Sequence, residues 1–115
     1  MDSCIFCKIA NKEIKVEKIY ENENFFSMLD KDQQVPGHSL VISKRHFKTT
    51  LDVPDTLGKE LLDCIKNTTI KLMKEHKSDG FNIINNNLSA AGQIVSHVHY
   101  HILPRKKGDK SPIVY

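Results

Sequence analysis

The chain has 115 residues, of which 39% are hydrophobic and 27% charged, and a formal net charge of +3. This length fits one compact domain over residues 1–115, and the composition excludes a disordered or membrane-spanning chain. The excess positive charge lies in residues 105–110, which we interpret as a solvated segment, and no basic stripe interleaved with aromatic residues indicates nucleic-acid binding. No basic and apolar leader opens the sequence, so we expect a cytoplasmic protein that makes no membrane contact.

The first half of the chain predicts three strands. Residues 15–20 and 24–30 are apolar-rich runs separated by the polar residues 21–23, which is typical of a hairpin. Residues 38–43 form a run with two β-branched residues directly after Pro36-Gly37, and we expect a third strand there.

The second half predicts one long helix and two more strands. Apolar residues recur at spacings of three and four between residues 55 and 77, with Asp55 as the expected N-cap and residues 78–80 as the stop. Residues 81–85 predict a fourth strand, 85–92 a loop of small residues, and 97–103 a fifth strand ended by Pro104. Strands in this order, with a single long helix, predict an α+β fold with an antiparallel sheet.

Three histidines alternate with apolar residues in the last predicted strand. His97, His99 and His101 would share one face, because side chains two residues apart on a strand point the same way. Burying three unpartnered imidazoles together is costly, so the pattern indicates a functional site. At ~3.3 Å per residue, His97 and His101 would stand about 13 Å apart, too far to bind one ion.

A mononuclear metal site at His99 and His101 is a weaker alternative. No Asp or Glu occurs between Asn82 and Lys107, so a carboxylate ligand would have to come from distant sequence. The Cys4-x-x-Cys7 pair has two open interpretations, a metal site or a redox pair, while Cys64 fits the core.

The segment from Gly92 to Leu103, with its H-φ-H-φ-H-φ-φ pattern, resembles the histidine triad (HIT) family of nucleotide-binding hydrolases and transferases. The resemblance extends to residues 4–9, Asp30, residues 36–42 and residues 44–46. It implies a HIT-like fold, with about five antiparallel strands, one long helix and a short N-terminal helix.

The resemblance also implies the chemistry. His99 would be the nucleophile that attacks the α-phosphate of a purine nucleotide, giving a nucleotidyl-histidine intermediate. His101 and Gln93 would contact the phosphate, backbone amides of residues 91–93 would line it, and His38 would support the triad. Asp30 would take the ribose hydroxyls and Asn86 would lie beside the phosphate. A nucleobase pocket would be formed by Ile5, Phe6, Ile9 and Met28.

The zinc-containing branch of the family binds structural Zn²⁺ through residues that match Cys4, Cys7, His46 and His97. This branch implies a Cys₂His₂ site beside the reactive histidine, and family membership implies a homodimer.

One position departs from the family pattern. Ile94 stands where the phosphoramidase branch has serine and the dinucleoside-polyphosphate branch has threonine. We expect a phosphoramidase-like nucleotide hydrolase. A dinucleoside polyphosphate hydrolase and a zinc-stabilised nucleotide-binding scaffold remain as alternatives.

Overall fold

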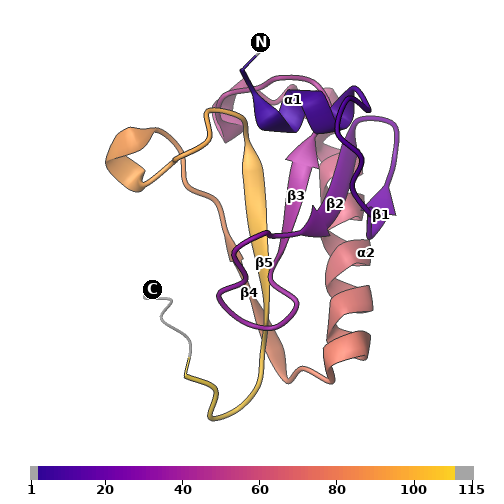
Figure 1. The fold of residues 1–115 in the computed structure, drawn as a ribbon, viewed down its shortest axis with the longest axis vertical. Coiled ribbons are helices and arrows are strands. Elements are labelled where there is room, and N and C mark those ends of the chain that lie inside the picture. Colours follow the sequence, from indigo (N-terminus) through magenta and orange to yellow (C-terminus); the bar gives the residue numbers. More distant parts are fainter. Residues whose placement is uncertain (1–2, 111–115) are drawn as a thin grey trace.

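The computed structural model describes residues 3–110. Five antiparallel strands form one sheet in the order β1-β2-β3-β5-β4 (Figure 1). The strands are β1 (Tyr20–Glu21), β2 (Phe25–Leu29), β3 (Ser39–Ser43), β4 (Gly80–Ile84) and β5 (His99–Arg105). The two α-helices are α1 (Ile5–Ala10) and α2 (Gly58–His76). The α+β fold with a short N-terminal helix and one long helix is therefore confirmed.

Alternation along the strands gives the sheet two different faces. One face packs against α2, and its core includes Phe25, Val41, Tyr100 and Ile102, together with Cys64 and Leu72 of the helix. The opposite face carries Phe26, Leu40 and Ile42, which pack against Phe6 and Ile9 of α1. In Figure 1, α1 covers only the upper end of this second face. The rest of that face is left for polar side chains.

Several boundaries differ from those that the sequence predicts. The first strand is only Tyr20–Glu21, and the last begins at His99 and continues through Pro104 to Arg105. Pro104 is tolerated because β3 pairs with β5 only as far as Ile102, so at Pro104 the strand has a neighbour, β4, on one side only.

Both ends of the long helix also differ from the prediction. Asp55 opens a 3₁₀ turn (Asp55–Leu57) rather than capping α2. Lys77, with φ of 51°, takes the left-handed position that ends α2, so Gly80 is free to begin β4. None of the described helices is long and apolar enough to cross a membrane.

Candidate active site and metal centre

Strand β5 places two of the three histidines on the face that α2 leaves open. His99 lies opposite Ile42 and His101 opposite Leu40 in the pairing of β5 with β3. Their rings are 5.1 Å apart between centroids. His97 precedes the strand, in a segment where its side chain turns toward the N-terminal helix. The predicted alternation therefore holds for His99 and His101, whereas His97 belongs to a different group.

The backbone fixes the proton position of His99. Its Nδ1–H donates to the carbonyl of His97 at 2.8 Å, so Nε2 keeps a free lone pair. The residue is only 8% exposed, and the ring of Phe6 packs edge-on against it at 5.2 Å. A buried imidazole whose Nδ1–H is held by a carbonyl presents Nε2 for nucleophilic attack.

A second chain of hydrogen bonds orients His101. The backbone N–H of Gln34 donates to Nδ1 of His38 at 3.1 Å, so the proton of His38 is on Nε2. That Nε2–H donates to Nδ1 of His101 at 2.8 Å, which in turn leaves the proton of His101 on Nε2. Oδ2 of Asp30 lies 3.3 Å from Nε2 of His38 and 3.8 Å from Nδ1 of His101. We call Asp30, His38 and His101 the relay cluster.

Burial keeps both histidines of the relay cluster neutral. Desolvation lowers the pKa of His101 to about 4, helped by the charges that His99 and His38 can carry. Desolvation likewise lowers the pKa of His38, and the carboxylate of Asp30 opposes this shift. A neutral pair is needed for the donor and acceptor pattern just described.

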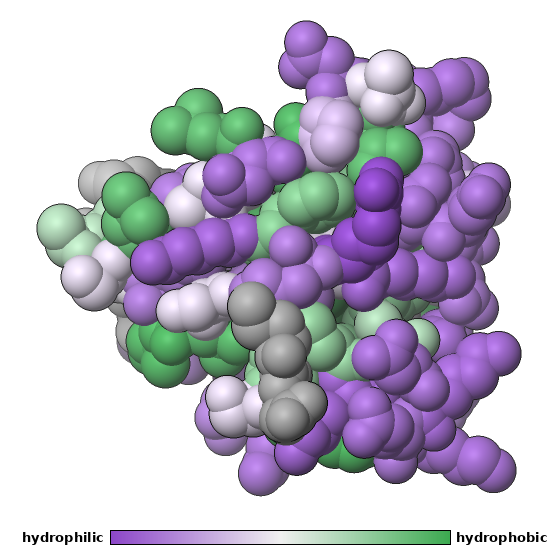
Figure 2. Space-filling model, turned by 90° about the horizontal axis from the view of Figure 1, so that it is seen from above, coloured by the Kyte–Doolittle hydropathy of each residue, from purple (hydrophilic) through white to green (hydrophobic). Residues whose placement is uncertain are grey.

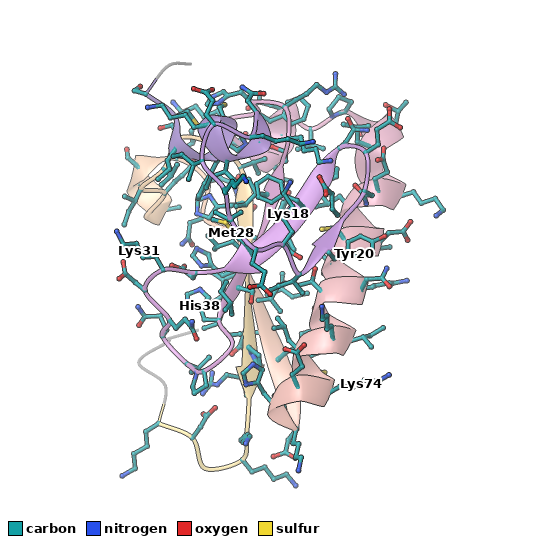
Figure 3. The ribbon with its side chains drawn as sticks, turned by 45° about the vertical axis from the view of Figure 1, so that its right-hand side comes forward. Lys18, Tyr20, Met28, Lys31, His38 and Lys74 are labelled. Carbon is teal, nitrogen blue, oxygen red and sulfur yellow. The ribbon has the colours of Figure 1, made fainter. Side chains whose placement is uncertain are left out.

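The relay cluster borders a hollow of about 350 Å³. Its lining also includes Asn86, Ile84 and Ile94, so Asn86 lies on the same hollow as the relay cluster. Figure 3 shows His38 at one end of the loop that carries Lys31, below Met28 of β2. Polar groups that can accept or donate hydrogen bonds thus meet an open cavity on this face.

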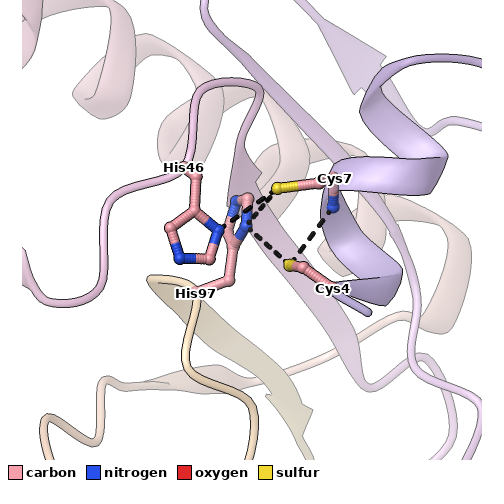
Figure 4. A group of neighbouring side chains, drawn as sticks. All are labelled: Cys4, Cys7, His46 and His97. Atoms are coloured by element: carbon pink, nitrogen blue, oxygen red, sulfur yellow. Dashed lines mark hydrogen bonds between the residues drawn. The ribbon is translucent and has the colours of Figure 1, made fainter. Parts of the chain in front are cut away.

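Four sulfur and nitrogen atoms meet at a separate point beside α1 (Figure 4). We call Cys4, Cys7, His46 and His97 the Cys₂His₂ cluster. Sγ of Cys4 is 3.2 Å from Nδ1 of His97, and Sγ of Cys7 is 3.2 Å from Nδ1 of His46 and 3.5 Å from Nδ1 of His97. In tetrahedral zinc sites, Zn–S bonds of ~2.3 Å and Zn–N bonds of ~2.0 Å separate sulfur from nitrogen by about 3.6 Å. The cluster is therefore close to the size that Zn²⁺ requires.

The hydrogen bonds of His97 also fit a metal ligand. Its Nε2–H donates to the carbonyl of Ser43 at 2.7 Å, so the lone pair of Nδ1 points at the two sulfurs. Burial lowers the pKa of this imidazole to about 4, which keeps it neutral at pH 7. Burial and the neighbouring Cys4 sulfur raise the pKa of the Cys7 thiol to about 11, so a bound cation would have to displace its proton.

Comparison with known proteins identifies the family. The HIT domain model matches residues 11–108. The chain belongs to the HIT family. A HIT-like protein of Methanocaldococcus jannaschii is 44% identical over 108 residues, covering 92% of this chain and 81% of that protein. A Streptococcus mutans structure superposes with a TM-score of 0.91 at 41% identity, covering 100% of this chain and 73% of that one.

Three other relatives have informative names. A Zn-bound histidine triad protein of Mycobacterium smegmatis has a TM-score of 0.87 at 35% identity, over 96% of this chain and 80% of that one. A Saccharomyces cerevisiae protein named adenosine 5′-monophosphoramidase is 36% identical, over 97% of this chain and 68% of its own. An Arabidopsis thaliana protein named adenylylsulfatase is 36% identical, over 94% of this chain and 55% of its own.

The loop before β5 is closed differently from what the HIT resemblance suggests. Oε1 of Gln93 accepts from the backbone N–H of Leu88, and Nε2 donates to the carbonyls of Lys48 and Val95. The amides of residues 91–93 donate to the carbonyls of Leu88 and Ser89, because the loop closes as a 3₁₀ turn (Ser89–Ala91). In this HIT protein, these groups hold the loop shut rather than facing the cavity.

The expected nucleobase residues are divided between two places. Phe6, Ile9 and Met28 pack together with the apolar side chains of β3. Ile5 is 49% exposed and lines another hollow, of about 530 Å³, together with Ile94 and Lys48. Figure 2, seen from above, shows apolar side chains gathered on the side where the Ser89–Ala91 loop projects. The most exposed apolar residues there include Ile94, at 93%, and Leu88, at 50%.

Two contributors were not anticipated from sequence. The backbone N–H of Gln34 sets the proton position of His38, and the carbonyl of Ser43 sets that of His97. Main-chain groups have no residue signature, so a motif does not reveal them. The one available signal is that Ser43 ends a β-branched run three residues before His46.

Proposed function

We propose that this HIT protein hydrolyses purine nucleotides at the α-phosphate, with His99 as the nucleophile and a phosphoramidate as the preferred substrate. The observation that carries the proposal is the 2.8 Å bond from Nδ1–H of His99 to the carbonyl of His97, which leaves Nε2 available. The relative named adenosine 5′-monophosphoramidase supports the same chemistry.

The reaction would proceed in two displacements. Nε2 of His99 attacks the α-phosphorus, and the bond from phosphorus to the leaving nitrogen or oxygen breaks with its electron pair going to the leaving group, which takes a proton. Water then attacks the nucleotidyl-histidine, losing a proton to solvent, and the bond from phosphorus to Nε2 breaks. The products are a nucleoside monophosphate and the regenerated imidazole. Splitting one displacement into two lowers the barrier of each.

His101 would stabilise the charge that develops on the phosphate. Its proton is on Nε2, because Nδ1 accepts from His38, and His101 lines the 350 Å³ hollow. A donor oriented before the reaction loses little free energy to reorganisation. Asn86 would lie beside the same phosphate, and Gln93 would contribute by holding the loop.

The nucleoside would be held by Asp30 and by apolar side chains of α1 and β2. Asp30 is expected to bind the two ribose hydroxyls, and Ile5, Phe6, Ile9 and Met28 to surround the purine base. Met28 is only partly buried and packs against the core that contains Phe6 and Ile9, which supports a place for the base beside β2.

The direct experiment is release of AMP from adenosine 5′-phosphoramidate, compared between the wild type and His99→Ala. We expect the variant to lose about 10³-fold or more of the activity, because the covalent route disappears. Nucleotide binding, measured by calorimetry, should persist in the variant. Equal activity of the two proteins would contradict the proposed nucleophile, and binding without any wild-type turnover would favour a nucleotide-binding scaffold.

A dinucleoside polyphosphate hydrolase is the second candidate, because Ile94 supplies neither the serine of the phosphoramidase branch nor the threonine of the dinucleoside-polyphosphate branch. Ile94 lines both hollows and carries no hydroxyl that could donate a proton to a leaving amine. A phosphate leaving group needs no such proton at pH 7. Higher kcat/KM for diadenosine polyphosphate than for the phosphoramidate would establish this alternative.

We further propose that the Cys₂His₂ cluster holds a structural Zn²⁺. A closed set of four protein ligands contributes to folding rather than to catalysis, because no coordination position is left for substrate. Cys4 and Cys7 lie at the start of α1, so the ion would tie this helix to His46 and His97. The Zn-bound relative from Mycobacterium smegmatis supports this proposal.

A homodimer is the expected assembly. β4 is an edge of the sheet, and its Phe81 and Ile83 are 46% and 47% exposed. An uncovered edge with apolar side chains favours pairing with a second copy. Sedimentation should give the mass of a dimer at micromolar concentration, and Ile83→Lys should shift it toward monomer. A monomeric wild type would contradict this proposal.

A further inference from the structure

Asp30 makes more contacts than a ribose-binding carboxylate needs. Its Oδ1 accepts the backbone N–H of Asp32 at 2.9 Å, and its own N–H donates to the carbonyl of His38 at 2.9 Å. These two bonds hold the side chain, which is 18% exposed, with Oδ2 directed at the two imidazoles of the relay cluster. The carboxylate is therefore placed by the backbone beside the pair of histidines.

The same three side chains do not suit a metal ion. A cation bound at Nε2 of His38 would force the proton of that ring onto Nδ1. Nδ1 already accepts the backbone N–H of Gln34 at 3.1 Å, so two N–H groups would then face each other. A hydrogen-bonded assembly agrees with the contacts, and metal binding does not.

The geometry identifies what the carboxylate can do when the pair gains a proton. Nδ1 of His38 accepts the backbone N–H of Gln34, so the nitrogen that can take the proton is Nδ1 of His101, which accepts only the Nε2–H of His38. A proton there would face the existing Nε2–H of His38 across 2.8 Å, which is repulsive. Oδ2 of Asp30, at 3.3 and 3.8 Å from these two nitrogens, is the negative charge that lies beside both N–H groups.

We propose that Asp30 is a positioning residue for the His38–His101 pair, which it stabilises after the pair has taken one proton from solvent. This inference rests on the proposed function. The added positive charge would lie between two negative groups. These are the carboxylate of Asp30 and the phosphate oxygens that accept from Nε2–H of His101. The other titratable groups that face the pair are His99 on β5, at 5.1 Å between ring centroids, and Asp32, which lines the hollow.

Ribose binding and pair stabilisation can be separated by the substrate. Adenosine 5′-phosphoramidate and its 2′,3′-dideoxy analogue differ only in the hydroxyls that Asp30 is expected to bind. Asp30→Asn keeps the side-chain size and the acceptor for the N–H of Asp32 but removes the charge. If Asp30 acts only on ribose, the variant and the wild type will have equal kcat/KM for the dideoxy substrate. We expect instead about a tenfold lower value for the variant, with its pH profile displaced toward acid.

A second measurement does not depend on turnover. The acid titration of the His38 and His101 rings can be followed by ¹⁵N NMR in ligand-free protein. Removing the carboxylate should lower the midpoints by about one pH unit, because an opposite charge within ~4–6 Å favours the charged imidazole. Asp32→Asn is the matched control: it removes the same charge two residues away, where no contact to either ring holds it, and it should shift the midpoints less.

The outcomes are decisive in each case. Unchanged midpoints in Asp30→Asn, or shifts no larger than those of Asp32→Asn, overturn the inference whatever the activity. Equal kcat/KM on the dideoxy substrate overturns it as well. If the wild type hydrolyses neither substrate, the proposed function fails, and the NMR titration alone still tests the placement of the carboxylate.

Discussion

The relay cluster and the Cys₂His₂ cluster each bring two histidines together with other side chains that could bind a metal ion. In each, the candidate ligand atoms lie within 4.8 Å of one another, and each includes two histidines. The difference lies in the backbone partners of the rings. The carbonyl of Ser43 accepts the Nε2–H of His97, so Nδ1, which faces the cluster, has a lone pair. The N–H of Gln34 donates to Nδ1 of His38, so Nε2, which faces its cluster, has a proton.

This difference shows that ligand types and distances do not define a metal site. When a carbonyl accepts the N–H of one ring nitrogen, the other nitrogen has a lone pair, which suits a cation. When a backbone N–H donates to one ring nitrogen, the other nitrogen of a neutral ring has the proton, which suits a hydrogen-bond acceptor. The predictions below test this distinction, beginning with the largest expected effect.

Replacing His101 should affect the reaction far more than the fold. His101→Asn removes the donor to the phosphate, and loss of one such donor commonly reduces kcat about 10²- to 10³-fold. The zinc content should stay that of the wild type, because His101 is not in the Cys₂His₂ cluster. Steady-state kinetics with metal analysis would check both points, and loss of bound zinc in this variant would contradict the separation of the two clusters.

Replacing a cysteine should have the opposite pattern. Cys7→Ser should lower the metal content and destabilise the fold by about 3 kcal/mol or more, since a structural zinc contributes directly to folding. That corresponds to a fall in Tm of roughly 10 °C for a chain of this size. Thermal unfolding with and without a chelator is the measurement. If a chelator does not change the Tm of the wild type, Cys4 and Cys7 are ordinary thiols and the prediction is wrong.

Acidification should destabilise the protein through the buried histidines. The folded-state pKa of His101 is about 4, below the ordinary value near 6.5, so the unfolded chain binds more protons between these pH values. Its contribution is fully present above pH 6.5 and is lost as the pH falls to about 4, by an amount on the order of 3 kcal/mol. Denaturant unfolding at several pH values should therefore give a flatter profile for His101→Asn than for the wild type. Parallel profiles would contradict the buried, neutral state of this ring.

A backbone substitution beside His38 should have a smaller effect. Gly37 has a φ of 88°, and a Cβ there would lie 2.5 Å from Nε2 of His76. Gly108 has a similar φ of 81° but open space around the same position. We expect Gly108→Ala to cost about 1 kcal/mol from the left-handed conformation alone, and Gly37→Ala roughly 2 kcal/mol because His76 must also move. Equal losses would show that the His76 contact is unimportant.

The sequence predicted the parts of the site that depend on alternation and spacing. His99 and His101 share a face because a strand alternates, and Cys4 and Cys7 meet because they flank the first turn of a helix. The position of Ile5 away from Phe6 was not predicted, because adjacent helical residues point about 100° apart and the packing of α1 decides which is buried.

Other features depend on tertiary contacts that no local pattern contains. The start of α2 at Gly58 rather than Asp55, and the engagement of the Gln93 amide by Leu88 and Lys48, are of this kind. The proton positions of His97 and His101 are set by Ser43 and His38, which are distant in sequence, so they follow only from the assembled sheet.

The bond that orients His99 has a consequence for how such proteins can diverge. Its acceptor is the main-chain carbonyl of residue 97, a group that every amino acid possesses, whereas the proposed zinc ligand is Nδ1 of the His97 imidazole. A lineage could therefore exchange the side chain at position 97, and with it the ion, without giving up the orientation of the neighbouring nucleophile. Residue 97 would thus serve stability through its side chain and reactivity through its main-chain carbonyl.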